Sequence, residues 1–242
     1  MSSTRREAIV RRFGIEPPVA RLVHEALDGA IRDAEARPDR ATRAIAALDA
    51  GCGRVSQLRS FRDRLDRVVG ADIHAPGQPL AHLDEFAVVD LCGPADSFAA
   101  ASFDVILSSF TLEHFEDPAA ALANLRAWLR PGGHLVATTV NRRHPFVAAY
   151  LGLPTAVRDR LQPLVKSAAA DAHRLVGACN DPATIAAAFE VAGFRDVRLT
   201  TVGHLARAWG RTWPTFAIGL AGDLVAQGVP ARRSTIVATG RA

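Results

Sequence analysis

The stretch Ala47-Leu48-Asp49-Ala50-Gly51-Cys52-Gly53-Arg54-Val55 decides the fold of this 242-residue chain. The residues around its start, 45–48, form a short apolar run that is typical of a buried strand in a parallel sheet. Two glycines follow, and glycine allows a sharp turn and a close approach of a ligand to the backbone. Residues 55–58 are predicted to begin a helix, whose N-terminal N–H groups attract the negative end of a ligand. A strand, a Gly-x-Gly turn and a helix predict the first crossover of a nucleotide-type α/β fold.

Two kinds of ligand compete for this turn. A dinucleotide fingerprint needs a third Gly or Ala three residues after the second glycine, and this chain has Ser56 there. Asp49, which comes directly before the turn, is unfavourable beside a pyrophosphate but suits a ligand that carries a cationic amine. The residues therefore favour an amine-bearing ligand over a nicotinamide dinucleotide, and a plain tight turn fits the same motif.

Further apolar runs follow the turn. They are residues 68–73, 88–91, 103–109 and 129–136. Asp49, Asp72, Asp90 and Ser108 then fall at the carboxyl ends of predicted strands, where ligands bind in open parallel sheets. Asp72 follows the glycines by about 20 residues, the spacing at which an acid meets a ribose in nucleotide-binding folds. An isolated Asp is more commonly a helix cap or a turn residue, so the prediction of one shared site rests on all four positions.

In this order the segments resemble the motifs of class I methyltransferases that use S-adenosylmethionine (SAM). The resemblance begins at Leu48-Asp49-Ala50-Gly51-Cys52-Gly53, includes the phrase Leu112-Glu113-His114, and runs from about residue 45 to the C-terminus. It implies a Rossmann-like α/β sheet of seven mostly parallel strands with the last strand antiparallel, helices on both faces and a helical cap. The chain departs from the family where Arg54-Val55 follows Gly53 directly, which predicts a tighter turn or an earlier helix start.

The resemblance also implies a cofactor site for SAM, with S-adenosylhomocysteine (SAH) as the product. Asp72 is expected to bind the ribose hydroxyls, and Asp90 is expected to face the adenine amino group. The predicted cofactor-binding residues are Asp49, Ala50, Gly51, Cys52, Gly53, Asp72, Ile73, Asp90, Leu91, Ser108 and Ser109.

His114 and His144 are the candidate general bases among the eight histidines, because each follows a predicted strand at the carboxyl edge. A base contributes about 10²–10⁴-fold when the acceptor is a hydroxyl. His114 carries over from the family only as a site-lining residue, and it also fits a helix-start residue that binds the backbone. We predict methyl transfer from SAM to a small-molecule or metabolite acceptor, with O, N and C acceptors all open. One alternative is an NAD(P)-dependent oxidoreductase. The other is a non-catalytic methyltransferase-like binding protein, and the shortened turn after Gly53 would favour it.

Composition and charge argue against several other classes. The formal charge is +4 with a pI near 9.6, but the arginines alternate with acids and form no basic stripe of the nucleic-acid-binding kind. Cys52, Cys92 and Cys179 match no zinc or disulfide pattern, so we expect no metal and a reducing compartment. The chain shows no signal-peptide pattern and no apolar run long enough for a bilayer. The sequence predicts a cytoplasmic protein that binds neither nucleic acid nor metal.

The chain divides into two predicted parts. Residues 1–44 form an N-terminal helical segment, which either packs on the sheet or closes over the cofactor. Residues 45–242 form the SAM-binding domain, with a helical cap inserted at about 141–180. Residues 194–202 and 234–239 alternate apolar and polar side chains, as strands do, and are expected to close the sheet.

Residues 204–229 lie between these last two strands and carry Trp209, Trp213 and Phe216. This segment is apolar enough for a substrate wall, a homodimer face or a surface that contacts lipid peripherally. The sequence leaves these three interpretations open.

Overall fold

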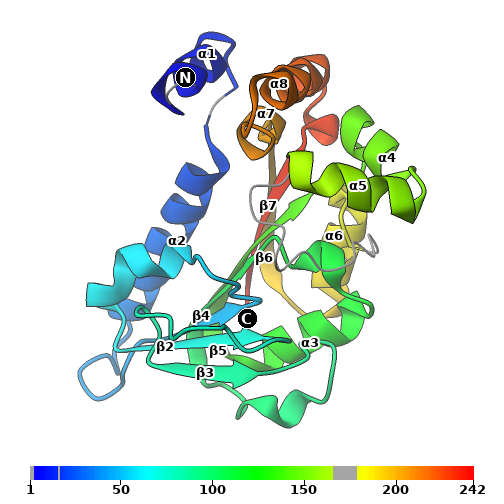
Figure 1. Ribbon diagram of the computed structural model, residues 1–242. Coiled ribbons are helices and arrows are strands. Elements are labelled where there is room, and N and C mark those ends of the chain that lie inside the picture. Colours follow the sequence, from blue (N-terminus) through cyan, green and yellow to red (C-terminus); the bar gives the residue numbers. More distant parts are fainter. Residues whose placement is uncertain (1–2, 16, 166–178) are drawn as a thin grey trace.

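The protein, described here from a computed structural model over residues 3–15, 17–165 and 179–242, is built on a seven-stranded sheet. The strand order is β3-β2-β1-β4-β5-β7-β6 (Figure 1). The strands are β1 Ala46–Ala50, β2 Arg67–Asp72, β3 Glu85–Val88, β4 Phe103–Ser109, β5 Leu129–Val140, β6 Arg195–Val202 and β7 Thr235–Arg241. β7 is antiparallel to β5 and β6, and all other neighbours pair in parallel. The predicted seven-stranded, mostly parallel sheet with an antiparallel last strand is confirmed.

Helices cover both faces of the sheet, which explains why the middle residues of its central strands are apolar. On one face α2 (Val19–Glu35) buries Val23, Leu27 and Ile31 against β4 and β5. On the other face lie α3 (Pro118–Trp128) and α6 (Pro182–Val191), and Trp128 is the largest fully buried side chain. Its indole nitrogen donates to the Ala95 carbonyl at 2.7 Å, so its polar atom also has a partner.

Several further helices gather beyond the carboxyl ends of β5 and β6 (Figure 1). They are α4 Pro145–Leu151, α5 Thr155–Val165, α7 Leu205–Ala208 and α8 Trp213–Gln227, with α1 Ser3–Arg12 beside them. Short 3₁₀ turns complete the chain: η1 Gln57–Arg64, η2 Ala95–Ser97, η3 Leu112–His114 and η4 Pro230–Arg232. α4 and α5 occupy part of the predicted cap, and residues 166–178 of that cap lie outside the described residues.

Two elements show how the structure compares with the sequence prediction. The helix expected to begin within residues 55–58 is the 3₁₀ helix η1, which starts at Gln57 after the N-cap Ser56, whose hydroxyl accepts from Leu58 N at 3.1 Å. The third strand was expected over residues 88–91 but spans Glu85–Val88. The Asp84 carboxylate accepts from Val68 N at 2.7 Å and sets this earlier register at the edge of the sheet.

The amino-terminal edge of the sheet is held by a buried acid. Asp104, at the start of β4, is 2% exposed and accepts hydrogen bonds from Ala46 N at 2.9 Å and from Arg37 Nη1 at 2.5 Å. Arg130 and Arg43 also pair with this carboxylate. Because a buried charge is costly without partners, this set of arginines is what allows Asp104 to sit between three strands.

Candidate functional site

The turn after β1 needs glycine at two positions. Gly51 and Gly53 have φ values of +76° and +49°, in the left-handed region that glycine adopts without strain. A Cβ on Gly51 would lie 2.4 Å from the side chain of Thr111, which approaches from the segment after β4. Gly51 N and Cys52 N donate to the Ala71 carbonyl at 2.7 and 3.1 Å. The turn is therefore tied to β2, and these N–H groups already have protein acceptors.

Asp72 ends β2 and holds the same turn from the other side. Its Oδ2 accepts from Gly53 N at 3.0 Å, and its Oδ1 accepts from His74 N at 3.3 Å. A carboxylate oxygen has two lone pairs, so each oxygen can bind this backbone and still accept a hydrogen bond from a ligand. Ile73 beside it is 50% exposed, an apolar surface that a bound ring would cover.

Asp90 follows β3 in a local turn. Its Oδ1 accepts from Cys92 N at 2.9 Å. The backbone of this turn is fixed from α3, because Asn124 donates to the carbonyls of Leu91 and Gly93 at 3.0 and 2.8 Å. The turn therefore presents its acid in a defined position.

Asp49 lies beneath the glycine turn and is 1% exposed. Burial raises the pKa of Asp49 to about 7, and the nearby Asp72 carboxylate acts in the same direction. A hydrogen bond from Ser56 acts in the opposite direction and lowers this pKa. Asp49 Oδ2 has no hydrogen-bond partner among the described residues. A cation placed beside a buried carboxyl group of this kind would stabilise its charged form.

The segment after β4 forms the opposite wall of the site. Ser109 Oγ lies 3.3 Å from Thr138 Oγ1 on β5, and Phe110 N donates to the Thr138 carbonyl at 2.9 Å. Phe110 has φ of +54°, a conformation that costs energy for a residue with a Cβ and clusters at functional sites. This bend carries the chain from β4 into η3, which ends at His114.

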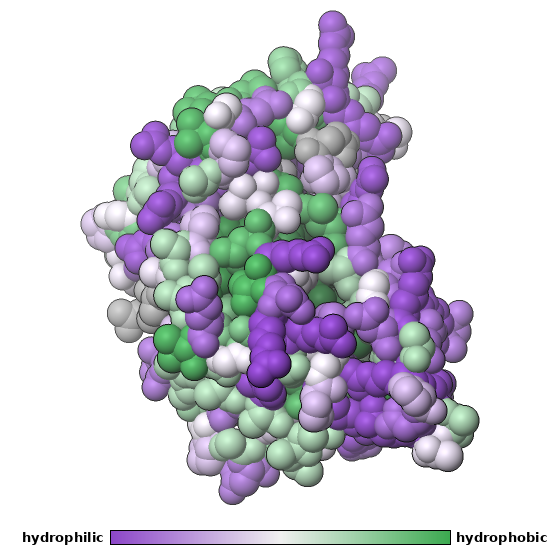
Figure 2. Space-filling view, turned by 180° about the vertical axis from the view of Figure 1, so that it is seen from behind, coloured by the Kyte–Doolittle hydropathy of each residue, from purple (hydrophilic) through white to green (hydrophobic). Residues whose placement is uncertain are grey.

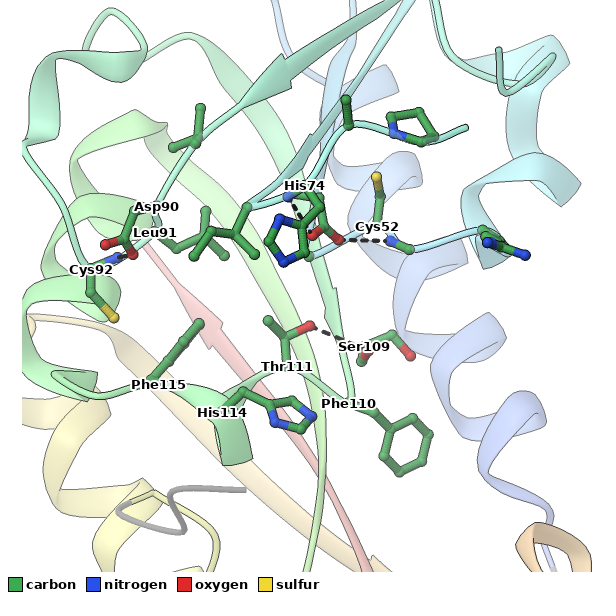
Figure 3. Close-up of a pocket in the computed structure, with 18 of the residues that line it drawn as sticks. Cys52, His74, Asp90, Leu91, Cys92, Ser109, Phe110, Thr111, His114 and Phe115 are labelled. Carbon is green, nitrogen blue, oxygen red and sulfur yellow. Dashed lines mark hydrogen bonds between the residues drawn. The ribbon is translucent and has the colours of Figure 1, made fainter. Parts of the chain in front are cut away.

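These segments enclose a cavity of about 640 Å³, a size typical of small-molecule sites. Figure 3 shows Thr111, His114 and Phe115 on one side of it, facing His74, with Asp90, Leu91 and Cys92 toward one end. Of the residues predicted from the sequence, the lining includes Gly51, Cys52, Gly53, Asp72, Ile73, Asp90, Leu91, Ser109 and His114. Asp49, Ala50, Ser108 and His144 are outside the lining.

His144 has a structural position. Its ring is fully buried, Nδ1 accepts from Phe146 N and Val147 N, and Nε2 meets the Gly222 carbonyl at 3.1 Å. Since Nδ1 accepts, the proton must sit on Nε2, and burial lowers the pKa of the ring. His144 caps the start of α4 and joins it to α8, away from the cavity. This geometry argues against the predicted role of general base.

Sequence reasoning missed several residues of the cavity wall, including Phe110, Thr111, His74 and Phe115. Phe110 also stacks on His204, with ring centroids 5.9 Å apart and planes at 23°. Burial lowers the pKa of His204 to about 4, so the ring is neutral at pH 7. Its Nδ1 is buried without a partner among the described residues. No sequence motif marks this pair, because the two residues come together only when β6 joins the sheet.

Metal binding is not indicated by the described part of the chain. Within those residues, no group of three or more His, Cys, Asp or Glu side chains is arranged to hold a metal ion.

Comparisons with known proteins agree with this geometry. A family model described as a methyltransferase domain matches residues 19–199. A ubiquinone biosynthesis O-methyltransferase of Cereibacter sphaeroides (strain KD131 / KCTC 12085) is 33% identical over 118 residues, which covers 46% of this chain and 48% of that protein. The chain thus aligns with about half the length of the curated relatives it matches.

Solved structures share the fold across more of the chain. A SAM-dependent methyltransferase from Archaeoglobus fulgidus has a TM-score of 0.55 at 14% identity, covering 97% of this chain and 98% of that one. A Haemonchus contortus phosphoethanolamine N-methyltransferase 2 in complex with SAM has a TM-score of 0.51 at 14% identity, covering 99% and 52%. These likenesses concern the fold, whereas the family model spans most of the sequence. The chain therefore belongs to the class I SAM-dependent methyltransferase family.

Proposed function

We propose that this protein transfers the methyl group of SAM to a hydroxyl oxygen of a small-molecule acceptor. The observation that carries the proposal is one cavity in which the glycine turn, Asp72 and Asp90 face His114. The choice of oxygen is supported by the curated relatives, which are named as O-methyltransferases.

The residues of the cavity fit SAM better than a dinucleotide. Asp72 would accept from the ribose hydroxyls and Asp90 from the adenine amino group, and the apolar side chain of Ile73 would pack on the adenosine. Asp49 lies beneath the glycine turn and outside the cavity lining, and its unpartnered Oδ2 suits the cationic amine of the methionine part. A pyrophosphate would need free N–H groups at the turn, but Gly51 N and Cys52 N donate to Ala71, and Gly53 N donates to Asp72. This arrangement weighs against an NAD(P)-dependent oxidoreductase.

SAM supplies an electrophilic methyl group on a sulfonium, and the chain contributes position and proton removal. Holding acceptor and donor in line at near-attack distance lowers the barrier by about 7–11 kcal/mol. His114 stands on the wall opposite the glycine turn, where it would act as the general base for the hydroxyl of an acceptor bound in the cavity. A base in this position contributes about 10²–10⁴-fold.

The test combines cofactor binding with turnover. SAM and SAH, but not NAD or NADP, should raise the thermal unfolding temperature, since a ligand of the native state stabilises by mass action. SAH release should then be measured with a panel of phenolic and aliphatic hydroxyl acceptors. His114→Ala should lower kcat about 10²–10⁴-fold and leave the Kd for SAM unchanged, with the exposed His24→Ala as the matched control.

The outcomes separate the proposals. Stabilisation by NAD or NADP alone would refute the assignment of the cofactor. SAM binding without turnover on any acceptor would favour the non-catalytic binding protein. Full turnover of His114→Ala on a hydroxyl acceptor would show that His114 is not the base.

The proposal extends to the organisation of the chain. Residues 45–242 would form the SAM-binding domain, and α4 and α5, the described helices of the predicted cap at about 141–180, would cover the acceptor side, which is supported by the position of α4 directly after β5. A cytoplasmic location is supported by Cys52, Cys92 and Cys179, which are all free thiols in this structure.

A further inference from the structure

The outer face of α8 is entirely apolar. Its large exposed side chains are Trp213 at 45%, Ile218 at 49%, Leu224 at 37% and Val225 at 64%. The other exposed residues of the helix are Pro214, Ala217 and Ala221. Exposed apolar side chains that adjoin one another on a helix indicate a surface that contacts a partner or a membrane. We call these residues the α8 surface.

The inner face of the same helix is closely packed, so α8 cannot rotate to bury its outer face. A Cβ on Gly219 would lie 2.6 Å from the Leu205 carbonyl oxygen, and one on Gly222 would lie 2.9 Å from the ring of Phe146. Asp223 is buried and accepts from Leu205 N at 3.1 Å and Ala206 N at 2.9 Å. The exposure of the α8 surface is therefore a fixed property of the fold.

The segments that adjoin this surface are rich in arginine. Gln227 Nε2 donates to the Phe13 and Gly14 carbonyls at 3.1 and 3.2 Å, which joins the end of α8 to the end of α1 and places the 46% exposed Phe13 beside it. Residues 3–15 and 203–234 carry eight arginines against the acids Glu7 and Asp223. Both acids are already engaged, since Glu7 pairs with Arg207 and Asp223 is buried. These two segments have a formal charge of +6 within a chain of +4.

Two views show where these helices lie and how hydropathy varies over this end of the molecule. In Figure 1, α1, α7 and α8 lie at the same end of the molecule. In Figure 2, hydrophobic residues gather at that end, next to the hydrophilic side chains on the side of α1.

We propose that the α8 surface and the arginines beside it dock the protein on an anionic lipid bilayer. An apolar helix face with a tryptophan and a basic border is the composition of a helix that lies in a membrane interface. Arginines next to the contact add attraction for anionic headgroups. Within the described residues, no helix is long and apolar enough to cross a membrane, so the contact would lie in the plane of the surface.

The positive charge beside the α8 surface favours a bilayer over the other partners that could cover this surface. A symmetric dimer would bring two copies of the same basic surface together, and the two copies would repel one another. A nucleic acid would attract the arginines, but it offers nothing apolar to cover Ile218, Leu224 and Val225. An anionic lipid surface matches both the charge and the apolar face.

The experiment is co-sedimentation of the full chain with phosphatidylcholine vesicles, with and without phosphatidylglycerol, at low and high salt. We expect binding to the anionic vesicles that weakens with salt, and little binding to the neutral ones. Val225→Asp should weaken the binding by about tenfold or more, because it removes apolar contact and adds a charge that the headgroups repel. Val191→Asp, at an 81% exposed valine on α6, is the matched control and should have no effect.

A second pair of substitutions tests the charge without touching the helix. Arg5→Gln and Arg12→Gln, both at exposed positions of α1, should each weaken binding by roughly fivefold. Circular dichroism checks that each variant is folded. Absence of binding to anionic vesicles, or equal losses for Val225→Asp and Val191→Asp, would overturn the proposal. So would a dimer in light scattering that Val225→Asp dissociates, or salt-sensitive binding to duplex DNA without binding to vesicles.

Discussion

Asp72→Ala is the substitution that tests the cofactor site most directly. In the structure, the carboxylate accepts from Gly53 N and His74 N and retains lone pairs on both oxygens for the ribose. A hydrogen bond to a charged group contributes about 1.5–3 kcal/mol. Two ribose hydroxyls therefore account for about 3–6 kcal/mol, which corresponds to a Kd for SAM about 10²–10⁴-fold higher in the variant.

The same substitution should have little effect on folding. The N–H groups of Gly53 and His74 are at exposed hydrogen bonds, so water can replace the carboxylate at a cost of about 1 kcal/mol or less. Asp72→Asn should be intermediate, because its amide offers one acceptor oxygen and places an NH₂ group opposite the other backbone N–H. Asp96→Ala, at an exposed position of η2, is the control for the loss of one surface charge.

Isothermal titration calorimetry with SAM and SAH, together with urea unfolding, measures both effects. A Kd for Asp72→Ala within threefold of the wild type would refute the ribose assignment. A large loss of unfolding free energy would show that Asp72 is mainly structural and that weaker binding is its consequence.

Three further predictions concern the turn, the sheet edge and pH. Gly51→Ala should lower the free energy of unfolding by about 1–3 kcal/mol and weaken SAM binding, because the φ of +76° strains alanine and its Cβ would meet Thr111; a variant as stable as the wild type in urea would contradict this. Asp104→Ala should cost about 3–5 kcal/mol, since it leaves buried arginine charge unpaired, whereas the exposed-side Asp66→Ala should cost about 1 kcal/mol or less. The native pKa of Asp49, about 7, exceeds the ordinary 3.8, so the folded protein binds the extra proton and the stability contributed by this group falls as pH rises from about 4 to 7. SAM is cationic at the amine and the sulfonium, so its affinity should rise as Asp49 loses its proton near pH 7. Asp49→Asn should abolish the pH dependence of SAM affinity in calorimetry and this contribution to the pH dependence of stability in thermal unfolding.

The sequence predicted the sheet because the sheet follows from local patterns. The middle residues of β1, β4 and β5, at positions 46–48, 105–107 and 135–137, are buried on both faces of the sheet, so their side chains are apolar. The closing pair, β6 and β7, was recognisable from alternation for the opposite reason, since β6 has one exposed face. β3 lies earlier in the chain than predicted because its register is set by a hydrogen bond from the backbone N–H of Val68 to the Asp84 carboxylate. These two residues are sixteen positions apart, so no local pattern encodes the bond.

The cavity likewise contains residues that local patterns predict and residues that depend on distant parts of the chain. Gly51, Asp72 and Asp90 follow strands and could be placed by counting, and all three line the cavity. Phe110 and His204 could not be placed, because one depends on an unusual backbone bend and the other on the return of the chain along β6. The geometry around His144 also depends on packing that the sequence does not encode. His144 follows β5, as the prediction of a general base required, but its Nδ1 accepts from the first turn of α4 and its Nε2 contacts Gly222 of α8.

The arginine set around Asp104 has a consequence for how this protein can change. Asp104 and Ser109 stand at opposite ends of β4, about 17 Å apart at the usual rise of a strand, so the residues that secure the sheet lie far from those that line the cavity. Random substitutions near Asp104 would mostly alter the amount of folded protein, whereas those at Phe110 and His114 would mostly alter the shape of the cavity. A library confined to the carboxyl edge could therefore explore new acceptors while the amino edge keeps the fold intact.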